Sequence, residues 1–422
     1  MEHDSTRDNR RRSQITLVVF ALIFIVLGFV VRLAASRTGT CYWLAPQSYI
    51  SIATNIVEGD GFLDEMSNFQ VPDRTRRPPL VPALIAACMM VFGKASGVAA
   101  FLALQAFLSA VTAVLIGLIG RRISGNRNLF FFLTAIYAAW GPAIELSRCA
   151  MTELTFIFLF AACLLALFTA FEKPHIGLFA TAGALMGLAS LTRPLLYPAY
   201  GLLALSWPWL FAKSVRIDRR KKLLTAVAFY GALLVVIAPW IVRNTTLNGR
   251  PTLITSSIGL NLLMQNAPVD QPEVWKYAVR ESKPGGELHG MNEAQRDRYL
   301  MDRALRYIRE DFTTFLGNAI LRIRLIYDSP MYNFPDLTVP IRWWHYGWML
   351  LILGLVLLLR GQPTKGLLVV LLLLNFNIVY SLTFFEARFR ETVMPLMMPL
   401  AGMGIVFLWR KAVRYIQKKK AE

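Results

Sequence analysis

Long apolar runs recur along the whole chain. Several of them approach the ~20 residues that an α-helix needs to cross a bilayer, and 55% of the 422 residues are hydrophobic. The runs predict eleven apolar segments, which cover residues 15–31, 79–92, 98–119, 129–146, 152–171, 176–191, 195–211, 223–242, 344–359, 366–385 and 393–409. Because backbone polar groups inside lipid must be paired within the protein, the chain is predicted to be an all-α polytopic membrane protein.

The distribution of basic residues predicts how the segments cross. The formal net charge is +19, but the cations stand in short loops between apolar runs, as the positive-inside rule expects, so no nucleic-acid partner is predicted. Basic flanks place both termini in the cytoplasm, which requires an even number of crossings. The segment 79–92 is the shortest and contains Pro82. It is therefore expected to be a partial span, which leaves ten full crossings.

The polar stretches predict one membrane domain, 1–422, with two long outer loops at 32–77 and 243–342. The first apolar run is interpreted as a retained anchor, because it is longer than the core of a signal peptide. In the second loop, Asn292 and Gln295 resemble a capping box that opens a helix ending near residue 310. A second amphipathic piece covers 312–327.

The first outer loop contains a short amphipathic helix. Its apolar face recurs at i, i+3, i+4 and i+7 and consists of Tyr49, Ile52, Ala53 and Ile56. Pro46 suits the first helical position, where a missing N–H is harmless, and Gly59 and Gly61 end the helix. Such a helix is expected to lie on the membrane surface rather than to cross it.

Cysteine and histidine usage limits the chemistry. Cys41 and Cys149 both map to the outer side, so a disulfide between them is possible, whereas Cys88 and Cys163 lie in spans and are interpreted as small apolar fillers. The histidines do not cluster with acidic residues, so no catalytic metal is predicted; they are His3, His175, His289 and His345. No glycine-rich phosphate loop is present in the sequence, which argues against nucleotide hydrolysis.

Charged residues at the outer ends of spans form the candidate site, because such charges are unfavourable unless they are paired or used. They are Glu153, Arg193, Arg243 with the adjacent Asn244, and the turn of Glu386, Arg388 and Arg390. Each also has a structural interpretation: a helix N-terminal carboxylate, snorkelling arginines and an ion-pair knot. The functional interpretation is a phosphate site, since guanidinium groups match phosphate oxygens through paired N–H donors.

Several motifs resemble, in order along the chain, those of the GT-C membrane glycosyltransferases. They are Tyr49-x-x-Ile52-Ala53-x-Asn55, Gly59-x-Gly61-Phe62, Arg77-Pro78-Pro79-Leu80-x-Pro82, the run from Gly183 to Pro194, Arg243-Asn244 and Ala387-Arg388-Phe389-Arg390. The resemblance is greatest to the bacterial branch that uses polyprenyl-phosphate sugars, which includes protein mannosyltransferases and lipid A aminoarabinose transferases.

The chain departs from this family at one position. In the family, an aspartate four residues before the tyrosine acts as the catalytic carboxylate, and here that position is Ala45. Local physics also favours aspartate there, because the residue before a proline-initiated helix is an N-cap, at which alanine is poorer by about 1 kcal/mol. The chain with Ala45 is therefore expected to have low catalytic activity, and Ala45→Asp is expected to raise that activity.

The resemblance implies a helical bundle with a cavity beneath the first outer loop, and sugar transfer from a polyprenyl phosphate carrier to a lipid, glycan or protein acceptor. It places Ala45 and Glu153 at the catalytic positions and implies substrate binding by Tyr49, Arg77, Arg193, Arg243, Asn244, Arg388 and Arg390. It further implies a site that faces outward from a bacterial cytoplasmic membrane, surrounded by membrane lipids, with no cofactor besides the lipid-linked sugar.

Two other functions stay open at this point. One is a pseudoenzyme that binds a lipid-linked sugar without transferring it. The other is a transporter or lipid flippase, which would need polar residues at mid-membrane depth, such as Asn375 and Asn377. A phosphate site predicts that Arg193, Arg243 and at least one of Arg388 and Arg390 share one cavity.

Overall fold

The computed structural model describes residues 2–38, 41, 45–67, 69, 72–211, 217–268, 271–328, 344–383 and 386–421. In the first half the helices are α1 Glu2–Thr38, α2 Ala45–Glu58, η1 Glu65–Ser67, α3 Leu80–Phe92, α4 Lys94–Ser124, α5 Arg127–Ala138, α6 Gly141–Leu146, α7 Glu153–Glu172, α8 Ile176–Thr192, α9 Tyr197–Ser206 and η2 Trp207–Trp209. In the second half they are α10 Arg219–Asn248, α11 Ile258–Asn266, α12 Gln271–Glu281, α13 Glu293–Glu310, α14 Phe312–Asp328, α15 Trp344–Gly361, α16 Pro363–Leu382, η4 Ala387–Val393 and α17 Met394–Ala421.

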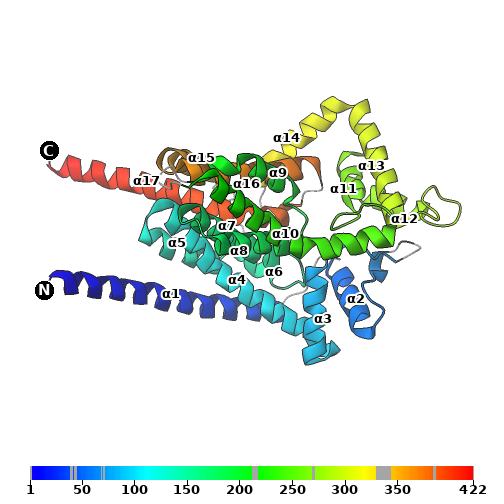
Figure 1. Cartoon of the computed structure of the whole chain (residues 1–422), viewed down its shortest axis with the longest axis horizontal. Helices are drawn as coiled ribbons and strands as arrows, with labels where there is room; N and C mark the ends of the chain where they lie inside the picture. Colours follow the sequence, from blue (N-terminus) through cyan, green and yellow to red (C-terminus); the bar gives the residue numbers. More distant parts are fainter. Residues whose placement is uncertain are drawn as a thin grey trace.

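The all-α polytopic fold is confirmed. Within the described ranges, six helical stretches are long and apolar enough to cross a membrane: Gln14–Thr38, Lys94–Ser124, Glu153–Glu172, Arg219–Asn248, Pro363–Leu382 and Arg388–Lys419. Three shorter apolar helices accompany them: Leu80–Phe92, Ile176–Thr192 and Gly347–Gly361. Both termini lie at one end of the bundle, and α2, α3 and α11–α13 gather at the other end (Figure 1).

Two of the eleven predicted segments differ from the helices that form. The segment 129–146 divides into α5 and α6 at Trp140, ahead of Pro142, and 195–211 ends its α-helix at Ser206, ahead of Pro208. A proline lacks the N–H that continues a helix and disfavours helical geometry in the residue before it. The segment 79–92 forms α3, which has 13 residues and runs across the axes of α1 and α4 (Figure 1). At about 1.5 Å per residue it is too short for a full crossing, as expected.

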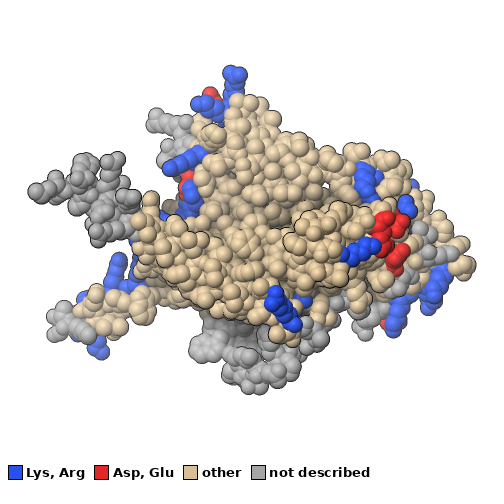
Figure 2. Space-filling model, turned by 90° about the horizontal axis from the view of Figure 1, so that it is seen from below, with Lys and Arg blue, Asp and Glu red and all other residues tan. Residues whose placement is uncertain are grey.

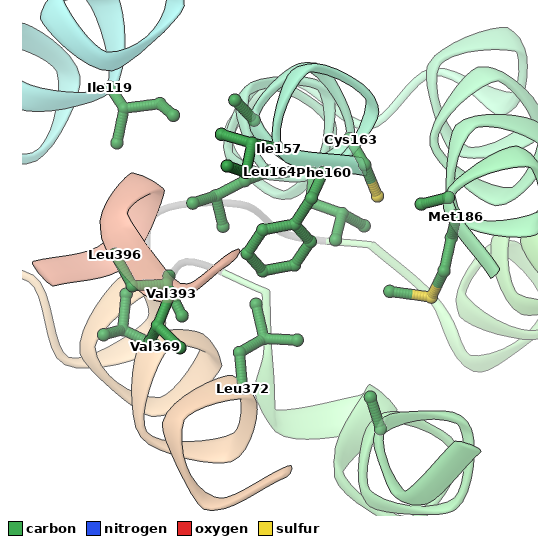
Figure 3. Packing of buried hydrophobic residues seen from close by; sticks show 14 of the residues in the cluster. Ile119, Ile157, Phe160, Cys163, Leu164, Met186, Val369, Leu372, Val393 and Leu396 are labelled. Atoms are coloured by element: carbon green, nitrogen blue, oxygen red, sulfur yellow. The ribbon is translucent and has the colours of Figure 1, made fainter. Parts of the chain in front are cut away.

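The core of the bundle is built around α7, whose residues contact α4, α8 and η4. Phe160 of α7 points toward Leu372 of α16, and Met186 comes from the neighbouring helix α8 (Figure 3). Gly183 allows α8 to touch α10 directly, because a Cβ at this position would lie 2.0 Å from the backbone oxygen of Phe229. This packing fixes the outer ends of α7 and α8, where two of the candidate site residues stand.

Arg32 joins α1 to the broken pair α5 and α6. Its side chain is fully buried, and it donates to Ser109 Oγ and to the carbonyl oxygens of Tyr137 and Ala138, each at 2.8 Å. Because α5 ends at Ala138, its last carbonyls have no partner within the helix. The guanidinium group donates hydrogen bonds to them, so an arginine of α1 pairs the carbonyl groups left where this apolar segment breaks.

The two outer loops lie at the same end of the bundle and contact each other. Glu293 Oε1 accepts the backbone N–H of Arg74 at 2.6 Å, and its Oε2 accepts that of Thr75 at 2.9 Å. Arg296 of α13 pairs with the buried Asp73 of the first loop. On the face seen in Figure 2, acidic and basic side chains lie next to each other at this end, while most of the surface between the two ends is formed by other residues.

The predicted capping box is present, and the disulfide that the sequence left possible is formed. Asn292 Oδ1 accepts the N–H of Gln295 and Gln295 Oε1 accepts the N–H of Asn292, both at 2.9 Å, at the start of α13. Cys41 and Cys149 form a disulfide with 5.3 Å between their Cα atoms. It ties the residues just before α2 to the turn that precedes α7.

Candidate active site

A cavity of about 700 Å³ opens at the outer end of the bundle. Its walls come from the start of α2, the stretch before α3, the α6–α7 turn, the end of α8, α11, α12 and the turn before η4. Its charged lining residues are Arg76, Arg77, Glu153, Arg193, Glu386 and Arg388. Four guanidinium groups and two carboxylates therefore share this space, which suits an anionic ligand with polar substituents.

Glu153 and two arginines form the innermost charged group. Glu153 begins α7 and is fully buried. Its Oε1 lies 2.7 Å from Arg193 Nη1 and 3.5 Å from Arg388 Nε, and its Oε2 accepts the hydroxyl of Thr152 at 3.2 Å. A buried carboxylate held by two cations stays ionised. Its position at a helix N-terminus, favoured by the helix dipole, fits the same charge state.

Arg193 ends α8 and has its side chain 12% exposed. It lies over the ring of Phe389 at 4.2 Å from the centroid. Burial alone would lower the pKa of Arg193, but the neighbouring Glu153 carboxylate raises it above its ordinary value. The guanidinium group is thus a permanent cation on the cavity wall, supported from behind by a carboxylate and an aromatic ring.

Arg77 also lines the cavity, beside the start of α2. It lies over the ring of Tyr49 at 5.2 Å, donates to Ser48 Oγ at 3.3 Å and is 3.7 Å from Asp64 Oδ2. Its neighbour Arg76 is held more tightly, 2.7 Å from the same Asp64 oxygen. The predicted binding residues Tyr49 and Arg77 are therefore adjacent in the cavity.

Glu386 is the second carboxylate on the cavity wall. Its side chain is 33% exposed, and its Oε2 lies 2.5 Å from Arg388 Nε. Burial raises the pKa of Glu386, and the nearby Arg388 opposes this rise only in part. Arg388 thus lies between the two carboxylates of the site, closer to Glu386 than to Glu153.

Arg243, Asn244 and Arg390 are not among the residues that line the cavity, so the expected convergence was wrong for Arg243. Arg243 stacks on Trp240 at 4.2 Å and donates to the carbonyl oxygen of Arg74 at 3.0 Å. Its planar guanidinium group is stacked on an aromatic ring, an arrangement that guanidinium groups favour. Asn244 is fully buried and donates to the carbonyl oxygens of Leu253 and Ile254.

Ala45 is the first residue of α2, and the cavity-lining residues Gln47, Ser48 and Tyr49 follow it within the first turns of that helix. The position that the family resemblance singles out is therefore on the element that forms one cavity wall. Among the described residues, no group of three or more His, Cys, Asp or Glu side chains could hold a metal ion.

The sequence did not indicate the buried charge cluster that supports this wall. Asp73 lies 2.6 Å from Arg76 Nε and also pairs with Arg296, 223 residues away. Burial raises the pKa of Asp73, and the two arginines act against it. The run of charges at 73–77 was a local signal for this cluster, but its partner on α13 was not recognisable from spacing.

Known proteins resemble this chain in sequence and in fold. Residues 76–242 match the family described as dolichyl-phosphate-mannose-protein mannosyltransferase. The fold matches that of the archaeal oligosaccharyltransferase AglB from Archaeoglobus fulgidus with a TM-score of 0.60 and 12% identity, over 97% of this chain and 52% of that one. This chain therefore has the fold of the archaeal oligosaccharyltransferase, and its residues 76–242 are similar to the mannosyltransferase family.

A second solved structure has a weaker similarity to this chain. ArnT from Cupriavidus metallidurans matches with a TM-score of 0.44 and 14% identity, over 93% of this chain and 78% of that one. The chain spans about half the length of the archaeal oligosaccharyltransferase chains it matches. No curated protein sequence matches it significantly.

Proposed function

We propose that this protein transfers a sugar from a polyprenyl-phosphate-linked donor to an acceptor at the outer end of the bundle. The observation that carries the proposal is the cavity in which Arg77, Arg193 and Arg388 stand beside the carboxylates Glu153 and Glu386. Several arginines in one cavity suit a phosphate, and the hydroxyl and amide groups of the same lining suit a sugar. The AglB structure, a complex with an inhibitory peptide and a dolichol-phosphate, supports a lipid phosphate as the ligand.

In the proposed reaction, the acceptor oxygen or nitrogen attacks the anomeric carbon of the sugar and loses its proton to a carboxylate. The bond between the anomeric carbon and the phosphate oxygen breaks, and its electron pair stays on that oxygen. The departing polyprenyl phosphate therefore gains one negative charge. Arg193 and Arg388 stabilise this charge, since preorganised donors in a cavity sheltered from water act strongly on charge that develops during the reaction.

Ala45→Asp is expected to raise sugar transfer by roughly 10²-fold, the lower end of the 10²–10⁴-fold range that a general base contributes. The binding of the donor should change little, because the phosphate-binding arginines are untouched. The measurement compares both forms, purified in lipid, on a panel of radiolabelled polyprenyl-phosphate sugars with crude acceptor membranes. Equal transfer by the two forms would place the base elsewhere than position 45.

The pseudoenzyme remains the second candidate function, because alanine occupies position 45 and Glu153 is held between two arginines. Failure of both forms to transfer sugar, with undecaprenyl phosphate still bound, would favour it. The transporter has less support, because the two asparagines of α16 are used in packing. Asn375 Oδ1 accepts the N–H of Ala199 at 2.8 Å, and Asn377 donates to the hydroxyl of Tyr327 at 2.8 Å.

The cavity is proposed to face away from the cytoplasm of a bacterial inner membrane. The Cys41–Cys149 disulfide next to the cavity supports this, since disulfides persist in oxidising compartments. A membrane-impermeant reductant added to intact cells is expected to open the disulfide, after which an impermeant maleimide labels the chain. The Cys41→Ser/Cys149→Ser variant should stay unlabelled, and labelling of the native chain only after cell lysis would reverse the orientation.

A further inference from the structure

We propose that Glu386 is the catalytic base of this chain, the group that accepts the proton of the acceptor when sugar is transferred. This inference rests on the proposed function and names its proton acceptor. The turn before η4 would then supply the proton-accepting carboxylate that the family resemblance places at position 45. The native chain is then an active transferase rather than a protein that binds the donor without transferring its sugar.

The proposal begins with the carboxylates that the cavity offers. Among its lining residues these are Glu153 and Glu386. Asp64 and Asp73 are 1% exposed, lie outside the lining and are paired with Arg76. Position 45 carries a methyl group. The proton of an acceptor bound in the cavity can therefore reach one of two glutamates.

Glu153 is a poor base in this setting. It has no exposed surface, and two guanidinium groups lie 2.7 and 3.5 Å from the same carboxylate oxygen, while the hydroxyl of Thr152 donates to the other. Cations and hydrogen-bond donors stabilise the ionised form, so a proton would be held weakly there. Glu153 is better described as a positioning residue that aligns Arg193 and Arg388.

Glu386 differs from Glu153 in the two properties that a base requires. One third of its side chain is exposed on the cavity wall, so an acceptor can reach it, and among the described residues its ion pair is with Arg388. Burial raises its pKa from the ordinary value, which brings a carboxylate nearer to the pH at which proton transfer is most efficient.

Its position also fits the charge changes of the reaction. Arg388 Nε lies 2.5 Å from Glu386 and 3.5 Å from Glu153, and Glu153 in turn holds Arg193. When Glu386 takes the acceptor's proton it becomes neutral, which frees Arg388 from its nearest anion. At the same time the leaving phosphate gains one negative charge beside Arg388 and Arg193. Glu386 then returns its proton to water.

The test uses the full-length chain in lipid, radiolabelled polyprenyl-phosphate sugars and crude acceptor membranes, with undecaprenyl phosphate as the binding probe. Glu386→Gln is expected to lower transfer by at least about tenfold, with binding of the probe unchanged, and Glu386→Asp should keep part of the activity. Glu273→Gln, a variant of an exposed glutamate on α12, is the matched control and should transfer at the native rate.

Two further readouts separate a base from a structural residue. The rate of sugar transfer by the native chain should fall at low pH, because Glu386 then becomes protonated in the presence of its charged neighbours Arg388, Arg193 and Glu153. Glu386→Gln should remove this acidic part of the pH profile. In an Ala45→Asp background, where a second carboxylate is available, Glu386→Gln should cost less than about threefold.

Several outcomes would overturn the proposal. Native transfer by Glu386→Gln would do so, as would an unchanged pH profile in that variant. Transfer by Ala45→Asp but none by the native chain would leave the proposed function standing and remove Glu386 from it. No transfer by either form would remove both.

Discussion

Arg193→Ala is expected to lower sugar transfer by roughly 10²–10³-fold, the loss that follows when one preorganised donor to a developing oxyanion is removed. Arg193 lines the cavity, pairs with Glu153 at 2.7 Å and stacks on Phe389. Its guanidinium group is therefore held in position before the donor binds. Arg193→Lys should recover a small part of the rate, because lysine keeps the charge but loses the planar fork. Initial rates with saturating radiolabelled donor would measure both effects.

The matched control for Arg193 is Arg148, in the same outer turn region but paired with Glu145 at 3.2 Å and outside the cavity lining. Arg148→Ala should transfer sugar at close to the native rate. A comparable loss in both variants would mean that general electrostatics at this end, and not the cavity, sets the rate. Binding of undecaprenyl phosphate by each variant would show whether donor affinity or the chemical step has changed.

Glu153→Ala is expected to destabilise the fold by about 3–5 kcal/mol, because removal of one partner leaves uncompensated charge in a buried ion pair. The two arginines that Glu153 contacts are 12% and 9% exposed, so water cannot replace the carboxylate fully. Unfolding by denaturant in mild detergent would measure the loss. Glu273→Ala, which breaks the exposed pair with Lys276, should change the free energy of unfolding little, and equal losses would contradict a buried pair at Glu153.

Much of the fold could be predicted because its signals are local. Apolar runs, the proline in 79–92 and the capping box at Asn292 each depend on residues within one or two helical turns of each other. Helix breaks were missed at Trp140 and Ser206, because a window of apolar residues does not register one proline inside it. The carbonyls freed at the first break are paired by Arg32, which no local pattern could indicate.

The candidate site was predictable in part. Glu153, Arg193 and Arg388 could be chosen because a charge at the end of an apolar segment is unusual in sequence, and the structure brings these three together. Arg243 satisfied the same criterion but stacks on Trp240 away from the cavity. The difference depends on the direction of a side chain at a helix end, which the spacing of residues does not determine. The Asp73–Arg296 pair joins residues 223 positions apart and had no sequence signal.

Arg32 has a consequence for the order in which the chain is assembled. Three of its acceptors belong to Ser109, Tyr137 and Ala138, which leave the ribosome more than 70 residues after it. Until they arrive, the guanidinium group has no protein partner outside its own helix and is held at the headgroup level, where water can reach it. We therefore expect the first helix to reach its final packing only after α4 and α5 have entered the membrane.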